Sequence, residues 1–390
     1  MIAPPWLALP IKGYGGIELV MQGIVDGLVE RGVEVTLFAN GQHKIRGVKT
    51  ESLYKTEQFD HIHKPYYEVM PVLQSHIQFA FNKILEDGKF DIVHDHNPLV
   101  GPVMLSLATR IKGFPPALHT FHGPPFSNKE SIASGVPDNR KPLEQIGDMG
   151  KLYMVCISEA MSKTVPNNIK TNILPAVHNA IEIEQFPFSK QKKDYFITLA
   201  RFTPDKAQHV AIKLCLRMKA KLRMAGTIAG IGSNRKLLFE LSNPLSAYRS
   251  SAEFKYYRNK IQPQVLRNRS ISYSGNLSGD KKMKFLSEAK ALLFPIDWEE
   301  PFGMAVIEAL ACGTPVVAMK RGAMPEIIEH GKTGFLANDE AEFYEYMQRV
   351  DEINPEDCRK SVERKFSAKA MADSYLDRYE EVLKLVKKKK

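Results

Sequence analysis

Two glutamates, Glu300 and Glu308, flank the start of a predicted helix at residues 304–311. Carboxylates accept hydrogen bonds from the hydroxyl groups of sugars and ribose, and the free N–H groups at a helix start favour phosphate. The stretch therefore suits a hydroxyl-rich ligand that carries phosphate. An ordinary helix with acidic residues near its start fits the pattern equally well, because the helix dipole stabilises such residues there.

A pair of cations, Arg201 and Lys206, follows a predicted strand at residues 195–200. Arginine offers a planar fork of N–H donors to phosphate oxygens, and lysine offers a compact positive charge. Their spacing across a turn that contains Pro204 would let both side chains converge on one anion. Two solvated surface cations are the alternative interpretation.

A glycine-rich turn at residues 13–16 precedes a predicted helix at 17–31. Gly15 and Gly16 could let the backbone approach a phosphate closely at the start of that helix. The third glycine of the dinucleotide-binding pattern GxGxxG is missing. A tight turn that needs a positive φ is therefore the alternative interpretation.

His122 follows another predicted strand, at residues 117–121, and could hydrogen-bond a substrate or stabilise developing charge. A single histidine is more often structural than catalytic. Asp95 and His96 follow the preceding predicted strand and are weaker candidates of the same kind. Ser158 opens a predicted helix and is well explained as its N-cap.

Two series of predicted strands alternate with helices, which is typical of parallel sheets built from β–α–β units. A Pro- and Lys-rich stretch at 186–193 separates the series and is interpreted as a linker. We therefore predict an α/β protein with two doubly wound domains and a boundary near residue 188. Ligands of such sheets bind beyond the carboxyl ends of the strands, so we expect the site in a cleft between the domains. The predicted strands lie at residues 33–38, 91–94, 117–121, 152–157, 195–200, 222–226, 270–275, 291–295 and 314–318.

The composition is that of a folded protein of two domains: 390 residues, 44% of them hydrophobic and 25% charged. Its four cysteines are widely spaced, which argues against a disulfide framework or a metal site. The sequence contains no apolar run of roughly 18 residues and no typical signal peptide. We therefore expect a cytoplasmic protein. Residues 1–10 are interpreted as a very short first strand that enters a loop, which suggests that a few native residues before Met1 are absent from the sequence.

The net charge of +10 indicates anionic partners, and part of it lies in the lysine run at 387–390. A basic surface could hold the protein peripherally at the inner face of a membrane. A solvated helix end is the alternative explanation of the lysine run. We expect no nucleic acid partner, and the sequence does not predict the oligomeric state.

Taken together and in this order, the motifs resemble the retaining glycosyltransferases of family 4 (group 1), which have the GT-B fold. The similarity covers nearly the whole chain and includes the E-x7-E signature from Glu300 to Glu308. A narrower resemblance, to a bacterial subgroup that includes pteridine glucosyltransferases, rests on residues 4–6 and 13–18. The matching positions of the family are residues 15–18, His122, residues 179–181, Arg201, Lys206, residues 224–226, residues 273–275, residues 300–308 and residues 331–335.

The resemblance implies two Rossmann-like domains that face a deep inter-domain cleft. Residues 1–187 would form the acceptor-side domain and residues 188–367 the domain that binds the nucleotide-sugar donor. Residues 368–390 would form a C-terminal helix, which packs back toward the N-terminal domain, and a basic tail. Ala180 and Ala207 stand where the family usually has glycine, which affects turn geometry but leaves the chemical groups in place.

The resemblance also implies the roles of individual residues. Arg201 and Lys206 would hold the diphosphate and stabilise it as it departs, Glu300 would bind hydroxyls of the donor sugar, Glu308 would bind the ribose, and His122 would lie beside the transferred sugar. The remaining donor-binding positions would be Gly15 and Gly16 at the phosphates, Phe302, Gly303 and Met304 beside Glu300, and Gly275 and Leu277 at the base.

The implied activity is retaining transfer of a hexosyl group from a nucleotide diphosphate sugar to an acceptor hydroxyl. A UDP-sugar is favoured and a GDP-sugar comes next, and the acceptor could be a small molecule, a glycan or a lipid-linked molecule. No metal or other cofactor is expected, because the sequence has no Asp-x-Asp motif. The alternatives are a nucleotide-sugar 2-epimerase of the same fold, a nucleotide-sugar-binding scaffold without turnover, and a dinucleotide-dependent oxidoreductase.

Overall fold

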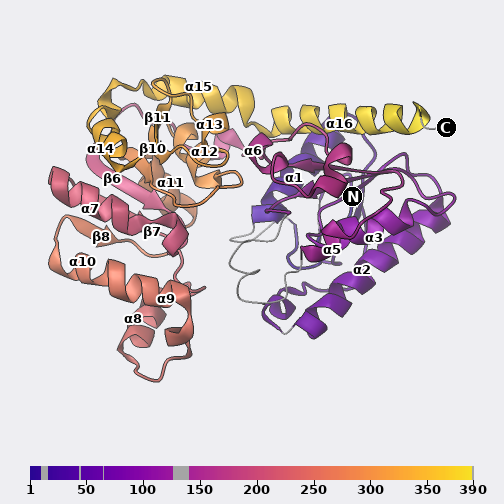
Figure 1. Cartoon of the computed structure of the whole chain (residues 1–390), viewed down its shortest axis with the longest axis horizontal. Helices are drawn as coiled ribbons and strands as arrows, with labels where there is room; N and C mark the ends of the chain where they lie inside the picture. Colours follow the sequence, from indigo (N-terminus) through magenta and orange to yellow (C-terminus); the bar gives the residue numbers. More distant parts are fainter. Residues whose placement is uncertain (10–15, 44, 65, 126–139, 389–390) are drawn as a thin grey trace. The chain divides into compact units, whose positions relative to one another are not determined.

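Alternating strands and helices give the chain two α/β units, as the sequence predicts (Figure 1). The computed structural model describes residues 1–390 apart from 10–15, 44, 65, 126–139 and 389–390. The first unit comprises residues 1–180 and 368–390, and the second comprises residues 181–367. All strand pairs between named strands are parallel, which is the pattern expected of β–α–β units.

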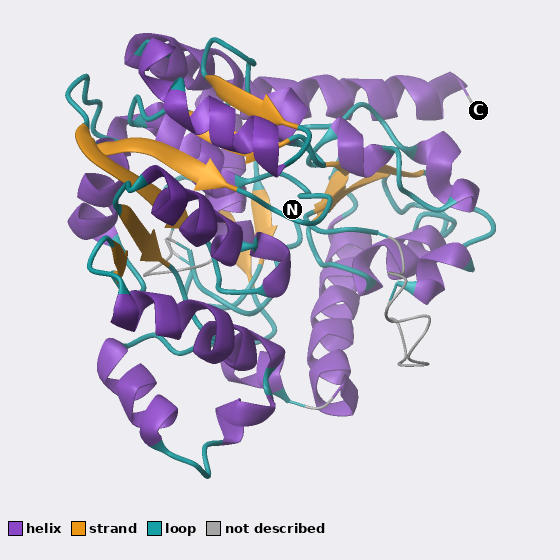
Figure 2. Ribbon diagram, turned by 60° about the vertical axis from the view of Figure 1, so that its left-hand side comes forward, coloured by secondary structure: helices purple, strands orange, loops and turns teal. Residues whose placement is uncertain are grey.

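A six-stranded parallel sheet forms the centre of the second unit, in the order β11-β10-β9-β6-β7-β8. Its inner strands are apolar and buried, because helices lie on both sides of the sheet (Figure 2). The strands are β6 (Lys193–Leu199), β7 (Leu222–Ala225), β8 (Ile271–Tyr273), β9 (Ala289–Phe294), β10 (Val316–Met319) and β11 (Gly334–Ala337). Strand β11 begins at residue 334, within the stretch that sequence analysis interpreted as a late turn.

The helices of the second unit connect these strands. The predicted helix at 304–311 is confirmed with the same bounds as α12. The longer helices are α7 (Gln208–Met218), α8 (Asn234–Ser242), α11 (Gly279–Ser287), α12 (Met304–Ala311), α14 (Glu340–Gln348) and α15 (Pro355–Lys365). The shorter ones are η3 (Ile183–Gln185), η4 (Pro204–Lys206), η5 (Ala247–Ser250), α9 (Ala252–Tyr256), η6 (Tyr257–Ile261), α10 (Gln262–Arg267), α13 (Met324–Ile327) and η7 (Val350–Glu352).

The first unit contains a parallel sheet in which Ile2 bridges two groups of strands. Ile2 pairs with Phe38 on one side and with Asp95 on the other, which gives the order β2, β1, Ile2, β3, β4, β5. The strands are β1 (Thr36–Phe38), β2 (Lys49–Glu51), β3 (Val93–Asp95), β4 (Ala117–Phe121) and β5 (Leu152–Cys156). The helices are α1 (Gly16–Glu30), η1 (Phe59–His63), α2 (Tyr66–Asp87), α3 (Val100–Ala108), α5 (Lys141–Glu144), α6 (Glu159–Ser162), η2 (Asn167–Asn172) and α16 (Ala368–Lys388).

Helix α16 belongs to the first unit although it ends the chain. Its Tyr375 and Val382 are buried in one apolar cluster with Val20 of α1. The two helices approach closely, since a Cβ atom on Gly27 would lie 2.5 Å from the Cβ of Ala372. No helix in the described part of the chain is long and apolar enough to span a membrane.

The boundary between the units differs from the predicted one near residue 188. Ile181 already belongs to the second unit, because its N–H donates to the Phe366 carbonyl at 3.0 Å. The stretch predicted as a linker is also anchored there. Lys192 Nζ donates to the carbonyls of Ser287 and Cys312 and to Thr314 Oγ1, at the ends of α11 and α12. Composition alone conceals this role, since a lysine that caps helix ends and a solvated lysine look identical in a sequence.

Candidate active site

Lys206, Glu300 and Trp298 meet at the carboxyl ends of two adjacent strands. Strand β6 leads into η4, which ends at Lys206, and strand β9 leads into the loop that carries the other two residues. Because β6 and β9 are paired in the sheet, their following loops lie next to each other. Lys206 Nζ pairs with Glu300 Oε2, and Trp298 Nε1 donates to the same oxygen at 2.9 Å.

This three-residue cluster is largely shielded from solvent. The side chains of Lys206 and Glu300 are each 11% exposed, and Lys206 Nζ lies 4.7 Å from the centroid of the Trp298 ring. Both hydrogen bonds reach Oε2, so among the described residues the other carboxylate oxygen is left for a ligand hydroxyl. The ammonium group has three donors, and Glu300 accepts one of them. The cluster can therefore bind a hydroxyl and an anionic oxygen side by side.

The backbone beside Lys206 is strained. Ala207 has a φ of +49°, a left-handed conformation that a residue with a Cβ adopts at a cost of about 1–2 kcal/mol. Glycine would adopt it freely, which explains why the family usually has glycine here. The turn keeps this geometry in spite of the alanine, and strain of this kind is concentrated at functional sites.

Glu308 lies on α12 and pairs with Lys282 of α11 at 2.6 Å. Burial raises the pKa of Glu308, and the ammonium of Lys282 opposes that rise. Gly303, with a φ of +108°, precedes α12, and a Cβ there would lie 2.8 Å from Met324 Cε. Phe302 is buried and Met304 is the first residue of the helix. The N–H groups at this helix start are therefore held in place by close packing.

Two glycines keep the loops after β6, β7 and β8 close together. A Cβ on Gly226 would lie 1.8 Å from the Ala200 carbonyl oxygen, and a Cβ on Gly275 would lie 2.7 Å from Asn234 Oδ1. Both have a positive φ, so glycine is required on two grounds. Leu277 follows in the same loop as Gly275 and is partly buried.

Arg201 does not share the carboxylate that Lys206 contacts. Its side chain is 60% exposed and pairs with Glu253 at 3.3 Å. Lys206 therefore pairs with Glu300 and Arg201 with Glu253, so in this structure the two cations do not converge on one anionic group. An exposed pair of this kind is worth little in stability, so a ligand anion could replace Glu253 as the partner of Arg201.

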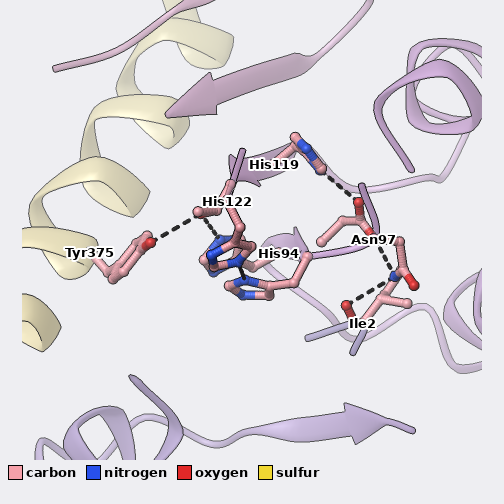
Figure 3. Close-up of polar contacts among 9 residues, drawn as sticks. Ile2, His94, Asn97, His119, His122 and Tyr375 are labelled. Carbon is pink, nitrogen blue, oxygen red and sulfur yellow. Dashed lines mark hydrogen bonds and ion pairs between the residues drawn. The ribbon is translucent and has the colours of Figure 1, made fainter. Parts of the chain in front are cut away.

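In the first unit, His122 follows β4 and contacts His96, which follows β3. The two rings share a hydrogen bond of 2.9 Å between His96 Nδ1 and His122 Nε2. Two other sets of polar contacts lie nearby: one joins His94 to Tyr375 through Thr120, and the other joins His119 to Asn97 through Asp95 (Figure 3). Burial lowers the pKa of His122 to about 3, so its ring is neutral near pH 7.

The remaining candidates of the first unit are Gly15, Gly16 and Ser158. Gly15 lies outside the described residues, and Gly16 is the exposed first residue of α1. Ser158 caps α6 as predicted, because its Oγ accepts the Met161 N–H at 3.1 Å.

Sequence reasoning missed the site contacts of Trp298, Lys282 and Asn234. The contact of Trp298 with Glu300 could have been suspected, because an aromatic residue with an N–H donor lies only two residues from a candidate carboxylate. Lys282 and Asn234 come from helices far along the chain, and nothing in their local sequence distinguishes them from solvated surface residues.

Comparisons with known proteins fit this architecture. Two family profiles match successive parts of the chain: Glycosyltransferase Family 4 over residues 14–184 and Glycosyl transferases group 1 over residues 180–365. The N-acetyl-alpha-D-glucosaminyl L-malate synthase of Bacillus anthracis is 23% identical, over 95% of each chain. Sucrose-phosphate synthase from Thermosynechococcus elongatus has a TM-score of 0.70 and 16% identity, over 98% of both chains.

A third similar protein is HepE of Anabaena, solved in complex with UDP and glucose. Its TM-score is 0.63 at 16% identity, and the match covers 96% of this chain and 99% of that one. The chain belongs to the group 1 glycosyltransferases of family 4 and has the GT-B fold, with two Rossmann-like domains. The fold and family predicted from the sequence are thereby confirmed.

Proposed function

We propose that the protein is a retaining glycosyltransferase that moves a hexosyl group from a nucleotide diphosphate sugar to an acceptor hydroxyl without a metal ion. The observation that carries the proposal is the shielded cluster of Lys206, Glu300 and Trp298. It offers a cation to a phosphate oxygen and a carboxylate oxygen to a sugar hydroxyl within one small site. Epimerisation without an acceptor is the alternative, and the same cluster would serve its donor.

The residues support a mechanism that stabilises the leaving group. When the bond between the sugar carbon and the phosphate oxygen breaks, the sugar gains positive charge and the diphosphate gains negative charge. Lys206, Arg201 and the N–H groups at the start of α12 would stabilise the diphosphate. The acceptor oxygen forms the new bond on the same face, and its proton passes to the departing phosphate oxygen. His122 would donate a hydrogen bond on the side of the transferred sugar.

Among donors, we propose a UDP-sugar first and a GDP-sugar second. HepE, a structural neighbour, was solved with UDP and glucose, which supports a UDP-sugar as the first choice. A thermal-shift panel of UDP, GDP, ADP and their sugars tests the choice, because a ligand of the native state raises its apparent stability. Failure of every nucleotide to raise the Tm would overturn a donor site. Incubation with UDP-GlcNAc alone that yields an epimer would favour the alternative.

We expect Glu300→Ala to impair transfer far more than nucleotide binding, because Glu300 contacts the sugar rather than the nucleotide. The loss of transition-state contacts should lower kcat by about 10²-fold, while the Kd for the nucleoside diphosphate changes by less than about threefold. Glu340→Ala, which removes an exposed glutamate paired with Lys213, is the matched control. Equal losses of transfer and binding would contradict a sugar-hydroxyl role.

We also propose peripheral contact with an anionic membrane surface, through the outer face of α8 and the turn that follows. Leu238, Phe239 and Leu245 are 68%, 64% and 90% exposed, and the exposed cations Arg235 and Lys236 lie on the same helix. Apolar side chains beside cations suit a lipid interface. Phe239→Ser should weaken co-sedimentation with phosphatidylglycerol vesicles several-fold, whereas Leu107→Ser, on the other unit, should not. Equal binding by both variants would exclude this surface.

A further inference from the structure

The register of β3 and β4 places four polar side chains on one face of the first unit's sheet. His94 pairs with Leu118 and Asp95 with His119 along the two strands. Because side chains alternate between the faces of a strand, His94, His96, Thr120 and His122 share one face. Tyr375 of α16 hydrogen-bonds Thr120 on this face, so α16 covers it.

His94 is anchored at both ring nitrogens. Its Nδ1 lies 2.7 Å from the hydroxyl of Tyr379, and its Nε2 lies 2.8 Å from Thr120 Oγ1. The Tyr375 hydroxyl lies 3.1 Å from the same Thr120 oxygen. Figure 3 shows Tyr375 reaching from α16 toward this network. With both nitrogens bonded, the ring of His94 has one fixed orientation.

His96 packs directly on this fixed ring. The centroids of His94 and His96 lie 4.0 Å apart, and His96 is fully buried. Its Nδ1 contacts His122 Nε2 at 2.9 Å, and its Nε2 has no hydrogen-bond partner among the described residues. Of the four histidines at these strand ends, only His122 is partly exposed, whereas His94, His96 and His119 are buried.

One proton lies between His96 and His122, because burial lowers the pKa of both rings and keeps both neutral. If His122 donates it, His96 must carry its own proton on Nε2, which leaves an N–H buried without an acceptor. If His96 donates it, only a lone pair of His96 is left unpartnered. In proteins, a buried N–H group without an acceptor is rarer than a buried lone pair without a donor. The second arrangement is therefore favoured, and it puts the His122 proton on Nδ1.

We propose that His96 is a positioning residue, which holds His122 as the neutral Nδ1–H tautomer and so presents an N–H donor from the partly exposed ring to an oxygen of the substrate. This inference rests on the proposed function, in which His122 serves the transferred sugar. Since His96 in turn packs on His94, the orientation of His122 is set from α16 through two buried rings.

Imidazole ¹⁵N chemical shifts of ¹⁵N-histidine-labelled protein test the tautomer directly at pH 7.5. In the wild type, we expect a protonated Nδ1 and an unprotonated Nε2 for His122, assigned by the loss of its signals in His122→Gln. In His96→Leu, the signals should move toward a mixture of tautomers. In His96→Asn, whose amide can donate from the position of Nδ1, the wild-type pattern should return.

Steady-state transfer provides the second readout. His96→Leu should lower kcat by about tenfold, the equivalent of one lost hydrogen bond, with little change in KM for the donor, and His96→Asn should recover most of it. His76→Leu is the matched control, since it removes another buried histidine of the first unit, one that bonds the Ala3 carbonyl. It should leave the His122 signals and kcat unchanged.

Two results would overturn the proposal: a His122 proton on Nε2 in the wild type, or unchanged shifts and kcat in a folded His96→Leu protein. The outcome is distinguishable from failure of the proposed function. If no nucleotide sugar supports transfer, the chemical shifts still establish whether His96 sets the tautomer of His122.

Discussion

Lys206→Ala is expected to lower kcat by about 10²–10³-fold, the range observed when one donor to a developing anion is removed. Lys206 is held beside the proposed leaving group by Glu300 and by the face of the Trp298 ring. Its charge acts in a site that is largely closed to water, where electrostatic interactions are stronger than at the surface. The substitution removes a donor that acts mainly as negative charge develops, so kcat should fall more than the affinity for the donor.

The same substitution also leaves Glu300 as a shielded carboxylate without its cation. Removal of one partner of a buried pair can destabilise a protein by about 3–5 kcal/mol, so a fall in activity could reflect unfolding. The double variant Lys206→Ala/Glu300→Gln removes that unpaired charge, and its comparison with Glu300→Gln alone isolates the effect of Lys206. Lys213→Ala, at an exposed pair, is the matched control and should leave both kcat and the Tm close to wild type.

The measurements are single-turnover transfer and thermal unfolding of each variant. Our interpretation requires that the double variant stays folded and transfers the sugar far more slowly than Glu300→Gln alone. A folded double variant with the same turnover as Glu300→Gln would show that Lys206 has no part in leaving-group stabilisation.

The secondary structure was predictable where the local sequence pattern is strong. The helix at 304–311 and the strand at 117–121 have the predicted bounds. Gly303 precedes the helix and Gly313 lies just beyond its end, while Pro116 precedes the strand, which contains the β-favouring residues Thr120 and Phe121. Strand β2 (Lys49–Glu51) was missed, because it lies at a sheet edge and its residues are polar and partly exposed. Short edge strands of this kind lack the apolar pattern that sequence analysis relies on.

The site was predictable in its residue types and not in its pairings. Lys206 and Glu300 each followed a predicted strand, but their contact depends on β6 and β9 being neighbours, which is a property of strand order. The pairing of Arg201 could not be predicted for the same reason, because its partner Glu253 lies on a separate element, the short helix α9. His96 was considered only as a weak candidate, since its significance arises from a second histidine on the next strand.

Mild acid is expected to destabilise the first unit selectively between pH 7.5 and pH 5. Burial lowers the pKa of His43 to about 4 and that of His122 to about 3, and it also lowers the pKa values of His76, His94 and His96. The unfolded chain takes up protons on these rings near pH 6.5, while the folded unit does not. The stability that these neutral rings contribute is therefore complete above the pKa of histidine in the unfolded chain, and it is lost as the pH falls below that value.

The size of this effect follows from the linkage between proton binding and folding. At pH 5, a histidine with a folded pKa of 4 or less contributes a loss on the order of 2 kcal/mol. His43 and His122 together would then exceed the effect of most point mutations. Buried Glu18 has a raised pKa, which acts in the opposite direction and reduces the loss in part. The pKa of Glu329, in the second unit, is lowered to about 2, so the stability that it contributes is lost mainly below this pH window.

The two tryptophans, Trp6 and Trp298, allow each unit to be followed separately, because one lies in each. Trp298→Phe leaves Trp6 to report urea unfolding of the first unit, and Trp6→Phe leaves Trp298 to report that of the second. The urea midpoint reported by Trp6 should fall markedly from pH 7.5 to pH 5, while that reported by Trp298 changes less. His43→Gln should reduce the pH effect on the first unit by about 2 kcal/mol. If both midpoints fall equally, or if His43→Gln leaves the difference intact, the buried neutral histidines are not the cause, since five described histidines of the first unit have a pKa lowered by burial, against His209 in the second.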